Sequence, residues 1–365
     1  MTPSIDGSKG LRIAVIGVID RRNPRLDEFV KGWRDLGADV KFVRIPAKRH
    51  AIVQLSAAVR GIRRLRWAQA IYAAPLHMRL GPAYWLLAKL VRRPLLLDYI
   101  VGLSDWIEDR SARSARHKQI ARWIDIFNLT RCDAISDTEQ HRAQLETLLG
   151  RPFPRLTVIP ISARSGIVPL PPPPTDALKH VLFVGSFIPF HGIEVIVRAA
   201  HLLRDRPDIR FVLIGSGQTL PQIEQLIREL DLSNVELRKG FFPLDTLRGD
   251  FERASVCLGV FGTGEKRNVV VPNKILDAIL LGRPVITAAS AAVEAVLTPG
   301  EHLVTIPPGD PRALAEAVSA LLAEPARSRA LVDAGRKWVA AERDAKTIAQ
   351  RVLNQLQQMA SGRMS

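Results

Sequence analysis

The chain has 365 residues, of which 47% are hydrophobic, so it is long and apolar enough for two globular domains. Its 24 glycines and 25 prolines are too few for a disordered or collagen-like protein, and two cysteines do not make a disulfide framework. The formal net charge of +16 indicates an anionic partner.

The positive charge is concentrated in the first half of the chain. Residues 1–165 hold 29 Lys and Arg against 15 Asp and Glu, a surplus of 14, whereas residues 166–365 hold 23 against 21. This asymmetry predicts that the first half meets phospholipid, nucleic acid or a phosphorylated acceptor. The N-terminus is polar rather than a secretory signal, and apolar runs are short, so we expect a cytoplasmic protein.

The first half begins with a β-α-β pattern. Leu11–Ile19 is typical of a buried strand, Leu26–Ala38 has helical spacing, and Asp39–Ile45 is a second strand. These elements predict a doubly wound domain, whose ligands bind at the carboxyl ends of the strands. The loop Asp20–Arg25 carries three arginines at that end, which suit an anion or solvent.

Residues 48–66 form a basic segment with apolar residues at helical spacing, namely Ile52, Leu55, Val59, Ile62 and Leu65. We expect this apolar stripe to pack against the sheet. A basic amphipathic helix can also lie on an anionic membrane surface. The candidate membrane contacts are Arg60, Arg63, Arg64 and Arg66, which would place the protein at the inner face of the membrane.

Further strands are predicted in the first half at Ala68–Ala74, Pro94–Gly102 and Leu156–Ile161. Acidic residues follow the second of these, and they suggest either a cleft or a capped helix start. Asp98 and Asp105 are therefore candidate catalytic residues.

The sequence between the halves contains Leu170–Thr175, a proline-rich run typical of a stiff linker. A second series of alternating strands and helices follows, which predicts another doubly wound domain. The predicted domains are residues 1–165 and 179–335, joined by a linker at 166–178, with a last helical segment at 336–365.

The strand ends of the second domain carry glycines that allow backbone to approach a phosphate or a sugar, namely Gly185, Gly192, Gly215 and Gly217. Each glycine alone also suits a turn.

The stretch Val269–Thr287 combines a loop, a helix and a strand. Asn273 follows Pro272 where an N-cap is expected, Gly282 ends the helix, and a strand follows Pro284. Unpaired N–H groups at a helix N-terminus attract phosphate, and Lys274 in the first turn adds positive charge. Asp277, one turn along, could accept hydrogen bonds from sugar hydroxyls. The same residues also suit an ordinary helix start.

This stretch resembles the nucleotide-sugar motif of family 4 retaining glycosyltransferases, which have the GT-B fold. In that family, two glutamates flank a loop that enters a helix. Asp277 occupies the position of the second glutamate, which in the family contacts the ribose of the donor. Val269 occupies the position of the first glutamate, which in the family contacts the transferred sugar. The segment Gly185–Gly192 resembles the family's phosphate site, with Ser186 and His191 in place of an arginine and a lysine. Lys266, Arg267 and Lys274 are the candidate replacements for that charge.

The resemblance implies two Rossmann-like α/β domains facing across a cleft, with the last helix crossing back onto the first domain. It implies transfer of a sugar, with retention, from a nucleotide diphosphate-sugar to a lipid-linked or polysaccharide acceptor. It implies neither a metal ion nor another cofactor. The implied donor-binding residues are Gly185, Ser186, His191, Gly192, Gly215, Gly217, Lys266, Asn273, Lys274 and Asp277, with His191 also a catalytic candidate.

Two alternatives follow from the same residues. Val269 and the altered Gly185–Gly192 segment suit a noncatalytic GT-B protein that binds a sugar nucleotide or another anion. The basic first half suits a nucleic-acid binder, although aromatic residues are nearly absent from the basic segment.

Overall fold

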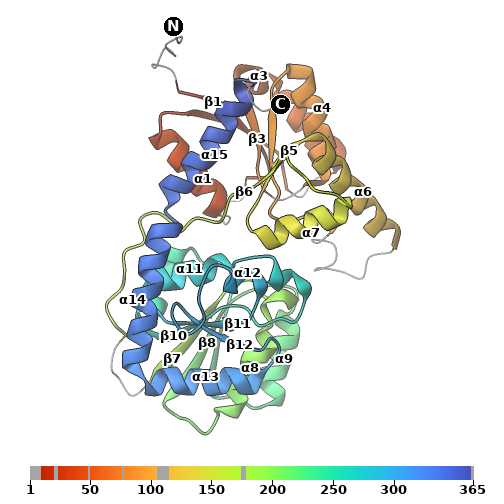
Figure 1. Cartoon of the computed structure of the whole chain (residues 1–365). Coiled ribbons are helices and arrows are strands. Elements are labelled where there is room, and N and C mark those ends of the chain that lie inside the picture. The colour runs from red at the N-terminus through yellow and green to blue at the C-terminus, as the bar shows by residue number, and fades with distance from the viewer. Residues whose placement is uncertain are drawn as a thin grey trace. The chain divides into compact units, whose positions relative to one another are not determined.

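The computed structural model describes residues 10–19, 24–47, 50–75, 78–104, 115–173 and 178–362. The chain divides into two compact units (Figure 1). The first unit contains residues 1–162 and 344–365, and the second contains residues 163–343. Each unit has one six-stranded parallel sheet, which confirms the prediction of two Rossmann-like α/β domains.

The sheet of the first unit has the strand order β2-β1-β3-β4-β5-β6. Its strands are short and mostly buried, as expected of a parallel sheet covered on both faces. They are β1 (Arg12–Gly17), β2 (Asp39–Arg44), β3 (Ala70–Ala73), β4 (Leu95–Asp98), β5 (Asp133–Ser136) and β6 (Leu156–Val158).

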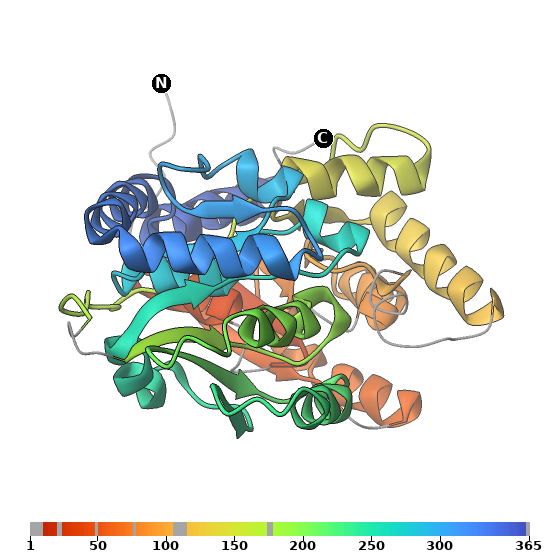
Figure 2. The ribbon, with the colours of Figure 1, turned by 90° about the horizontal axis from the view of Figure 1, so that it is seen from below.

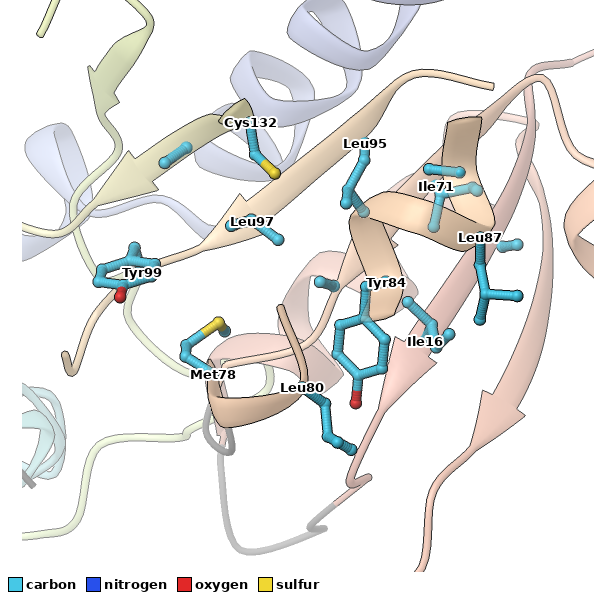
Figure 3. Packing of buried hydrophobic residues seen from close by; sticks show 14 of the residues in the cluster. Ile16, Ile71, Met78, Leu80, Tyr84, Leu87, Leu95, Leu97, Tyr99 and Cys132 are labelled. Atoms are coloured by element: carbon cyan, nitrogen blue, oxygen red, sulfur yellow. The ribbon is translucent and has the colours of Figure 1, made fainter. Parts of the chain in front are cut away.

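Successive residues of β1 point into two separate cores because side chains alternate along a strand. Ile13 and Val15 pack with α1 (Pro24–Asp35) and α15 (Ala345–Ala360). Ala14 and Ile16 face the other core, part of which Figure 3 shows around Tyr84 and Leu97. That core is covered by α2 (Ala51–Arg60), α3 (Ile62–Trp67), α4 (Gly81–Val91), α6 (Ala115–Arg131) and α7 (Glu139–Leu149).

The sheet of the second unit has the order β12-β11-β10-β7-β8-β9. Its strands are β7 (Lys179–Val184), β8 (Ile209–Gly215), β9 (Val235–Lys239), β10 (Ala254–Leu258), β11 (Val285–Ala288) and β12 (Val304–Ile306). Because the order reverses between β7 and β10, the switch point of this sheet lies between those two strands.

One face of the second sheet shares a core with α8 (Ile193–Leu202), α9 (Leu220–Glu229) and α13 (Pro311–Ala323). The remaining helices of the unit are α10 (Arg248–Arg253), α11 (Asn273–Leu280), α12 (Ala291–Glu294) and α14 (Pro325–Glu342). Short 3₁₀ turns complete the chain, at η1 (Met78–Leu80), η2 (Pro189–His191), η3 (Leu244–Leu247) and η4 (Glu265–Asn268).

The return of the chain to the first unit begins at Asp344, not at residue 336 as the helical pattern suggested. The reason is that α14 continues to Glu342 and packs beside α11, whereas α15 packs along α1. Gly32 lets α1 and α15 approach closely, because a Cβ there would lie 2.4 Å from the Cβ of Ala349. The Trp33 indole nitrogen donates to the Ala349 carbonyl at 3.0 Å.

The described part of the proline-rich segment is held against the second unit rather than free. The Leu170 N–H donates to the Leu281 carbonyl at 3.1 Å, and the buried Arg283 donates to the Pro171 carbonyl at 2.8 Å. Arg283 also donates to the Phe251 carbonyl, so one guanidinium joins three segments.

The basic segment forms two helices, and the predicted burial of its apolar stripe is wrong for α2. Ile52 is 81% exposed, and Leu55 and Val59 are also exposed, whereas Gln54 and Ala58 face inward. The helices break at Gly61, where a Cβ would lie 2.3 Å from the Cγ1 of Val43. After this break, α3 buries Leu65 as predicted. None of the helices in the described ranges is both long and apolar enough to cross a bilayer.

Candidate functional site

The candidate site lies wholly in the second unit, at the carboxyl ends of β7, β8 and β10 and beside the start of α11. This is the switch point of a doubly wound sheet, where such folds bind ligands. The loop after β7 contains Gly185, Ser186 and the 3₁₀ turn that ends at His191. Gly192, at φ +60°, then starts α8.

Three of the four predicted glycines serve close packing of backbone. A Cβ on Gly215 would lie 1.9 Å from the Gly185 carbonyl oxygen, and one on Gly217 would lie 2.3 Å from the Phe187 carbonyl oxygen. A Cβ on Gly192 would lie 2.4 Å from the Gly262 nitrogen. These contacts join the loops after β7, β8 and β10 into one wall, which is a structural role that the glycine pattern did not indicate.

Gly185 differs from the other three because it faces a side chain. A Cβ at Gly185 would lie 2.4 Å from the Nζ of Lys274 and 3.4 Å from the Cε1 of His191. Any other residue at position 185 would therefore force the end of the Lys274 side chain to move. The glycine leaves the room in which the amine of Lys274 lies.

Lys274 is the central residue of the site. Its Nζ is buried and has no hydrogen-bond partner in the part of the chain that the structure describes. The amine lies 3.8 Å from the centre of the Phe183 ring, a distance at which a cation is attracted to the ring face. Phe183 belongs to β7, and sequence analysis did not identify it as a site residue, because an apolar residue in a buried strand has the pattern of core packing.

Burial lowers the pKa of Lys274 well below its ordinary value. Burial, and then the charges of Lys274 and Lys266, lower the pKa of His191 well below its ordinary value as well. The Nδ1 of His191 donates a hydrogen bond to the Ser186 carbonyl, which fixes the ring. The site therefore contains nitrogen groups whose positive charge a bound anion would stabilise.

The Nζ of Lys266, in η4, lies 5.9 Å from the centre of the Phe190 ring. The sequence predicted Asn273 as the N-cap of α11, and this prediction is wrong. Pro272 occupies the cap position, no side chain caps the helix, and Asn273 is its first residue. The first turn therefore has no side-chain acceptor for its N–H groups.

Asp277 has a partner that the sequence did not reveal. The Nε of Arg164 lies 3.1 Å from each of its carboxylate oxygens, and the Asp277 side chain is only 9% exposed. Arg164 precedes Asp277 by 113 residues, so no local pattern could connect the two. The predicted contact between Asp277 and a ribose stays a prediction.

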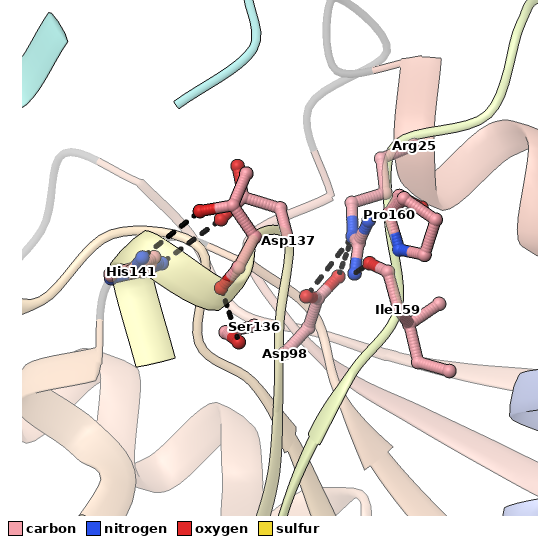
Figure 4. Close-up of polar contacts among 8 residues, drawn as sticks. Arg25, Asp98, Ser136, Asp137, His141, Ile159 and Pro160 are labelled. Atoms are coloured by element: carbon pink, nitrogen blue, oxygen red, sulfur yellow. Dashed lines mark hydrogen bonds and ion pairs between the residues drawn. The ribbon is translucent and has the colours of Figure 1, made fainter. Parts of the chain in front are cut away.

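Asp98, a candidate catalytic residue, lies in a buried polar cluster of the first unit (Figure 4). Asp98 is fully buried, and the Nε of Arg25 donates to both carboxylate oxygens at 3.1 and 3.0 Å. The Tyr72 hydroxyl donates to the same carboxylate, and Arg25 also donates to the Ile159 and Pro160 carbonyls. Asp98 therefore holds together α1, β3, β4 and the end of β6, and Arg25 serves the fold rather than an external anion.

Figure 4 also shows a second buried pair in the first unit, in which the Nδ1 of His141 lies 3.0 Å from Asp137. Asp105, the other carboxylate candidate, lies outside the described residues, as do Arg21 and Arg22 of the arginine-rich loop. In the part of the chain that the structure describes, no group of three His, Cys, Asp or Glu residues could hold a metal ion. Cys132 and Cys257 are free, and burial raises the pKa of each thiol to about 12.

These two units and the site at the switch point define a GT-B fold, and comparison with known proteins agrees. Residues 178–324 match the family described as glycosyl transferases group 1. The chain is 28% identical over 197 residues to an exopolysaccharide phosphotransferase of Streptomyces coelicolor, covering 53% of this chain and 20% of that protein. It is 29% identical over 231 residues to D-inositol 3-phosphate glycosyltransferase of Kineococcus radiotolerans, covering 54% and 50%.

Among solved structures, sucrose-phosphate synthase of Thermosynechococcus elongatus superposes with a TM-score of 0.77 at 20% identity, covering 96% of this chain and 100% of that one. HepE of Anabaena, solved in complex with UDP-glucose, gives a TM-score of 0.75 at 15% identity, covering 95% and 99%. The chain spans half the length or less of the two curated relatives. Together the solved structures support the GT-B fold over nearly the whole chain, and residues 178–324 resemble glycosyl transferases group 1.

We expect Asp98→Ala to destabilise the first unit by about 3–5 kcal/mol, because it leaves the buried cation of Arg25 without its carboxylate. Urea unfolding measures the loss. Arg25→Met combined with Asp98→Leu should recover much of it, and Asp39→Ala, at an exposed carboxylate, should change stability by less than about 0.5 kcal/mol. Unchanged stability of Asp98→Ala would show that the pair does not hold the fold.

Binding of inorganic diphosphate should be coupled to proton uptake by Lys274. Since burial lowers the pKa of the free amine and an anion beside it raises that pKa, binding takes up a proton at any pH between the two values. Calorimetry in buffers of different ionisation enthalpy measures the protons taken up. The Lys274→Met variant should take up fewer protons than the wild type when diphosphate binds. Equal proton uptake by the variant and the wild type would contradict the placement of the anion beside Lys274.

Proposed function

We propose that the chain is a glycosyltransferase that takes a sugar from a nucleotide diphosphate-sugar bound at the candidate site, with the diphosphate beside Lys274. The observation that carries this proposal is the buried amine of Lys274, which has no hydrogen-bond partner among the residues that the structure describes. A buried polar group without a partner destabilises a fold. A phosphate oxygen would supply both the missing acceptor and the opposite charge.

Other groups around Lys274 support the same ligand. The first N–H groups of α11 have no side-chain cap, and a helix N-terminus attracts anions. Lys266 lies on the adjacent turn and adds a second cation. Ser186, in the loop after β7, and Asn273, the first residue of α11, add short polar side chains to these segments.

The charge arrangement suits departure of a nucleoside diphosphate. When the bond between the sugar and the diphosphate breaks, negative charge develops on the leaving phosphate, and a cation fixed beside it lowers the barrier. We propose that the sugar keeps its anomeric configuration, with an oxygen of the donor phosphate as the base for the acceptor hydroxyl. This mechanism requires no carboxylate base, which agrees with the structural role of Asp98.

The nature of the donor is inferred from similar proteins. HepE was solved with UDP-glucose, and its fold covers nearly all of this chain. We therefore propose a nucleoside diphosphate donor, with Asp277 contacting the ribose. That contact requires the carboxylate to bind the ribose beside Arg164 or to exchange partners with it.

For the acceptor we propose a lipid-linked sugar or a polysaccharide. The relative in Streptomyces coelicolor is an exopolysaccharide enzyme, and the surplus of basic residues in the first half suits a phosphorylated acceptor. Cytoplasmic location belongs to the same proposal. A noncatalytic sugar-nucleotide protein would bind the same donor at Lys274 without releasing the nucleoside diphosphate.

The proposal predicts different effects for two substitutions in the site. Lys274→Met should weaken the binding of UDP or GDP by about tenfold to a hundredfold, because a charge-assisted contact contributes about 1.5–3 kcal/mol. The same substitution should leave the affinity for the free nucleoside unchanged. Asp277→Asn should weaken the binding of the nucleotide and of the free nucleoside equally, because the proposed contact of the Asp277 carboxylate is with the ribose. Calorimetric titration measures both.

Stability separates a functional effect from damage. Lys274→Met should raise the free energy of unfolding while weakening the nucleotide, because it replaces an unpaired buried amine with an apolar side chain of similar length. Lys337→Met, at an exposed lysine of α14, is the matched control and should change neither quantity. Unaltered nucleotide affinity in a folded Lys274→Met protein would refute the site. Wild-type binding without release of UDP or GDP from the matching sugar nucleotide in the presence of acceptor would refute catalysis.

A further inference from the structure

The first unit exposes large apolar side chains on α2, α4 and α6. Helix α4 contacts both α2 and α6, and Figure 2 shows the ribbon of these helices in orange to yellow. We call this surface the α2–α4–α6 face. Its exposed apolar residues are Ile52, Val53, Leu55 and Val59 on α2, Leu86 and Leu90 on α4, and Ile120 and Trp123 on α6. Leu86, Leu90 and Trp123 are each more than 60% exposed. Single exposed apolar residues scattered over a surface are normal, but a group of them on neighbouring helices indicates an interaction site.

The three helices are held together beneath these residues. Trp85 of α4 meets the ring of Phe127 of α6 edge-on, with 5.6 Å between the ring centres. Arg79, next to α4, donates to the buried Gln54 of α2 at 2.7 Å. The three helices are therefore fixed relative to one another by these contacts.

The orientation of α2 is unusual for a surface helix. Gln54 is fully buried and satisfied by the Pro46 carbonyl and by Arg79, while Ile52 points into solvent. A helix that only covered the sheet would bury isoleucine and expose glutamine. The polar contacts of Gln54 thus hold α2 with its apolar side outward.

Charge on these helices is of one sign. Nine exposed Lys and Arg residues lie on the described parts of α2, α3, α4 and α6, namely Arg60, Arg63, Arg64, Arg66, Lys89, Arg116, Lys118, Arg122 and Arg131. The one acidic residue on these helices is Asp125, which is fully buried and accepts from the N–H groups of Leu103 and Ser104. The face therefore presents apolar side chains surrounded by cations.

We infer that the α2–α4–α6 face docks on an anionic lipid bilayer. The guanidinium and ammonium groups pair with headgroup phosphates, and the apolar side chains enter the boundary between headgroups and acyl chains. Trp123 suits that boundary, where tryptophan is enriched. The sequence named as membrane contacts Arg60, at the end of α2, and Arg63, Arg64 and Arg66 of α3. The structure adds the outward apolar side of α2 and the contributions of α4 and α6.

Two other occupants fit the face less well. Nucleic acid would pair with the cations but would leave the aliphatic residues of α2 and α4 in water, and stacking would have a single largely exposed aromatic residue, Trp123. A second copy docked through the same face would place nine cations against nine, which is unfavourable. An anionic bilayer matches both the apolar residues and the charge.

The inference is independent of the proposed function, because it uses residues of the first unit alone. Sedimentation of the whole protein with vesicles tests it. Vesicles of phosphatidylglycerol mixed with phosphatidylcholine should bind the protein, with affinity falling as salt rises, and phosphatidylcholine vesicles should bind it much more weakly.

The charge variant replaces three face arginines by glutamine, at Arg60, Arg63 and Arg122. It should lose on the order of a hundredfold in affinity for the mixed vesicles, since each cation near an anionic surface contributes roughly fivefold. The matched control removes the same charge from the second unit, by glutamine at Arg312, Arg329 and Lys337, and should keep its affinity. Equal loss of vesicle affinity in the charge variant and in its control would show that only the net charge of the protein matters. That result would contradict docking through the α2–α4–α6 face.

The apolar variant replaces Ile52, Leu86 and Trp123 by glutamine and should lose at least tenfold, because it removes the side chains that enter the bilayer. Its control places glutamine at Val168, Leu202 and Phe242, which are exposed in the second unit. Trp123 also reports entry directly. The tryptophan emission should shift to shorter wavelength on vesicle binding, and Trp123→Phe should remove most of that shift.

Three results would contradict the inference. The first is no binding to either kind of vesicle. The second is loss of vesicle binding in the charge variant but not in the apolar variant, which would indicate a purely electrostatic surface such as a nucleic-acid site. The third is an apolar variant that converts a dimer into a monomer and keeps its vesicle affinity, which would assign the face to a second copy.

Discussion

The candidate site depends on the position of one amine. Lys274 extends from the first turn of α11 over the ring of Phe183, and Gly185 leaves the space that it occupies. Burial disfavours the charged form of this amine, and no group in the described ranges of the chain accepts a hydrogen bond from it. The fold therefore retains a buried amine that lowers its stability, and a bound anion would offset this loss of stability. The amine lies at the edge of the sheet where doubly wound proteins bind their ligands.

The two units differ in charge. The second has nearly balanced charge and contains the candidate anion site, whereas the first carries almost all of the excess positive charge. In our proposals the second unit binds the donor and the first lies on the membrane. A lipid-linked acceptor is the class of substrate that such an arrangement would serve, since it is confined to the surface on which the protein docks.

The sequence predicted those features that depend on local pattern. Alternating apolar strands and helices indicated both doubly wound units, Gly282 does end α11 with a positive φ, and Lys274 does lie in the first turn. Contacts between residues far apart in the chain could not be predicted in this way. The partner of Asp277 is Arg164, the partner of Asp98 is Arg25, and the glycines after β8 pack on the loop after β7. Helical spacing also identified the stripe on α2 without showing whether sheet or solvent would face it.

The most direct test of the central claim is a crystal structure of the protein with a nucleoside diphosphate. The claim predicts that the Nζ of Lys274 lies about 2.7–2.9 Å from a phosphate oxygen, the distance of a charge-assisted hydrogen bond. The diphosphate should lie at the start of α11, against the loop that follows β7. A nucleotide bound elsewhere, or a Lys274 amine still without a polar partner beside the bound nucleotide, would contradict the account.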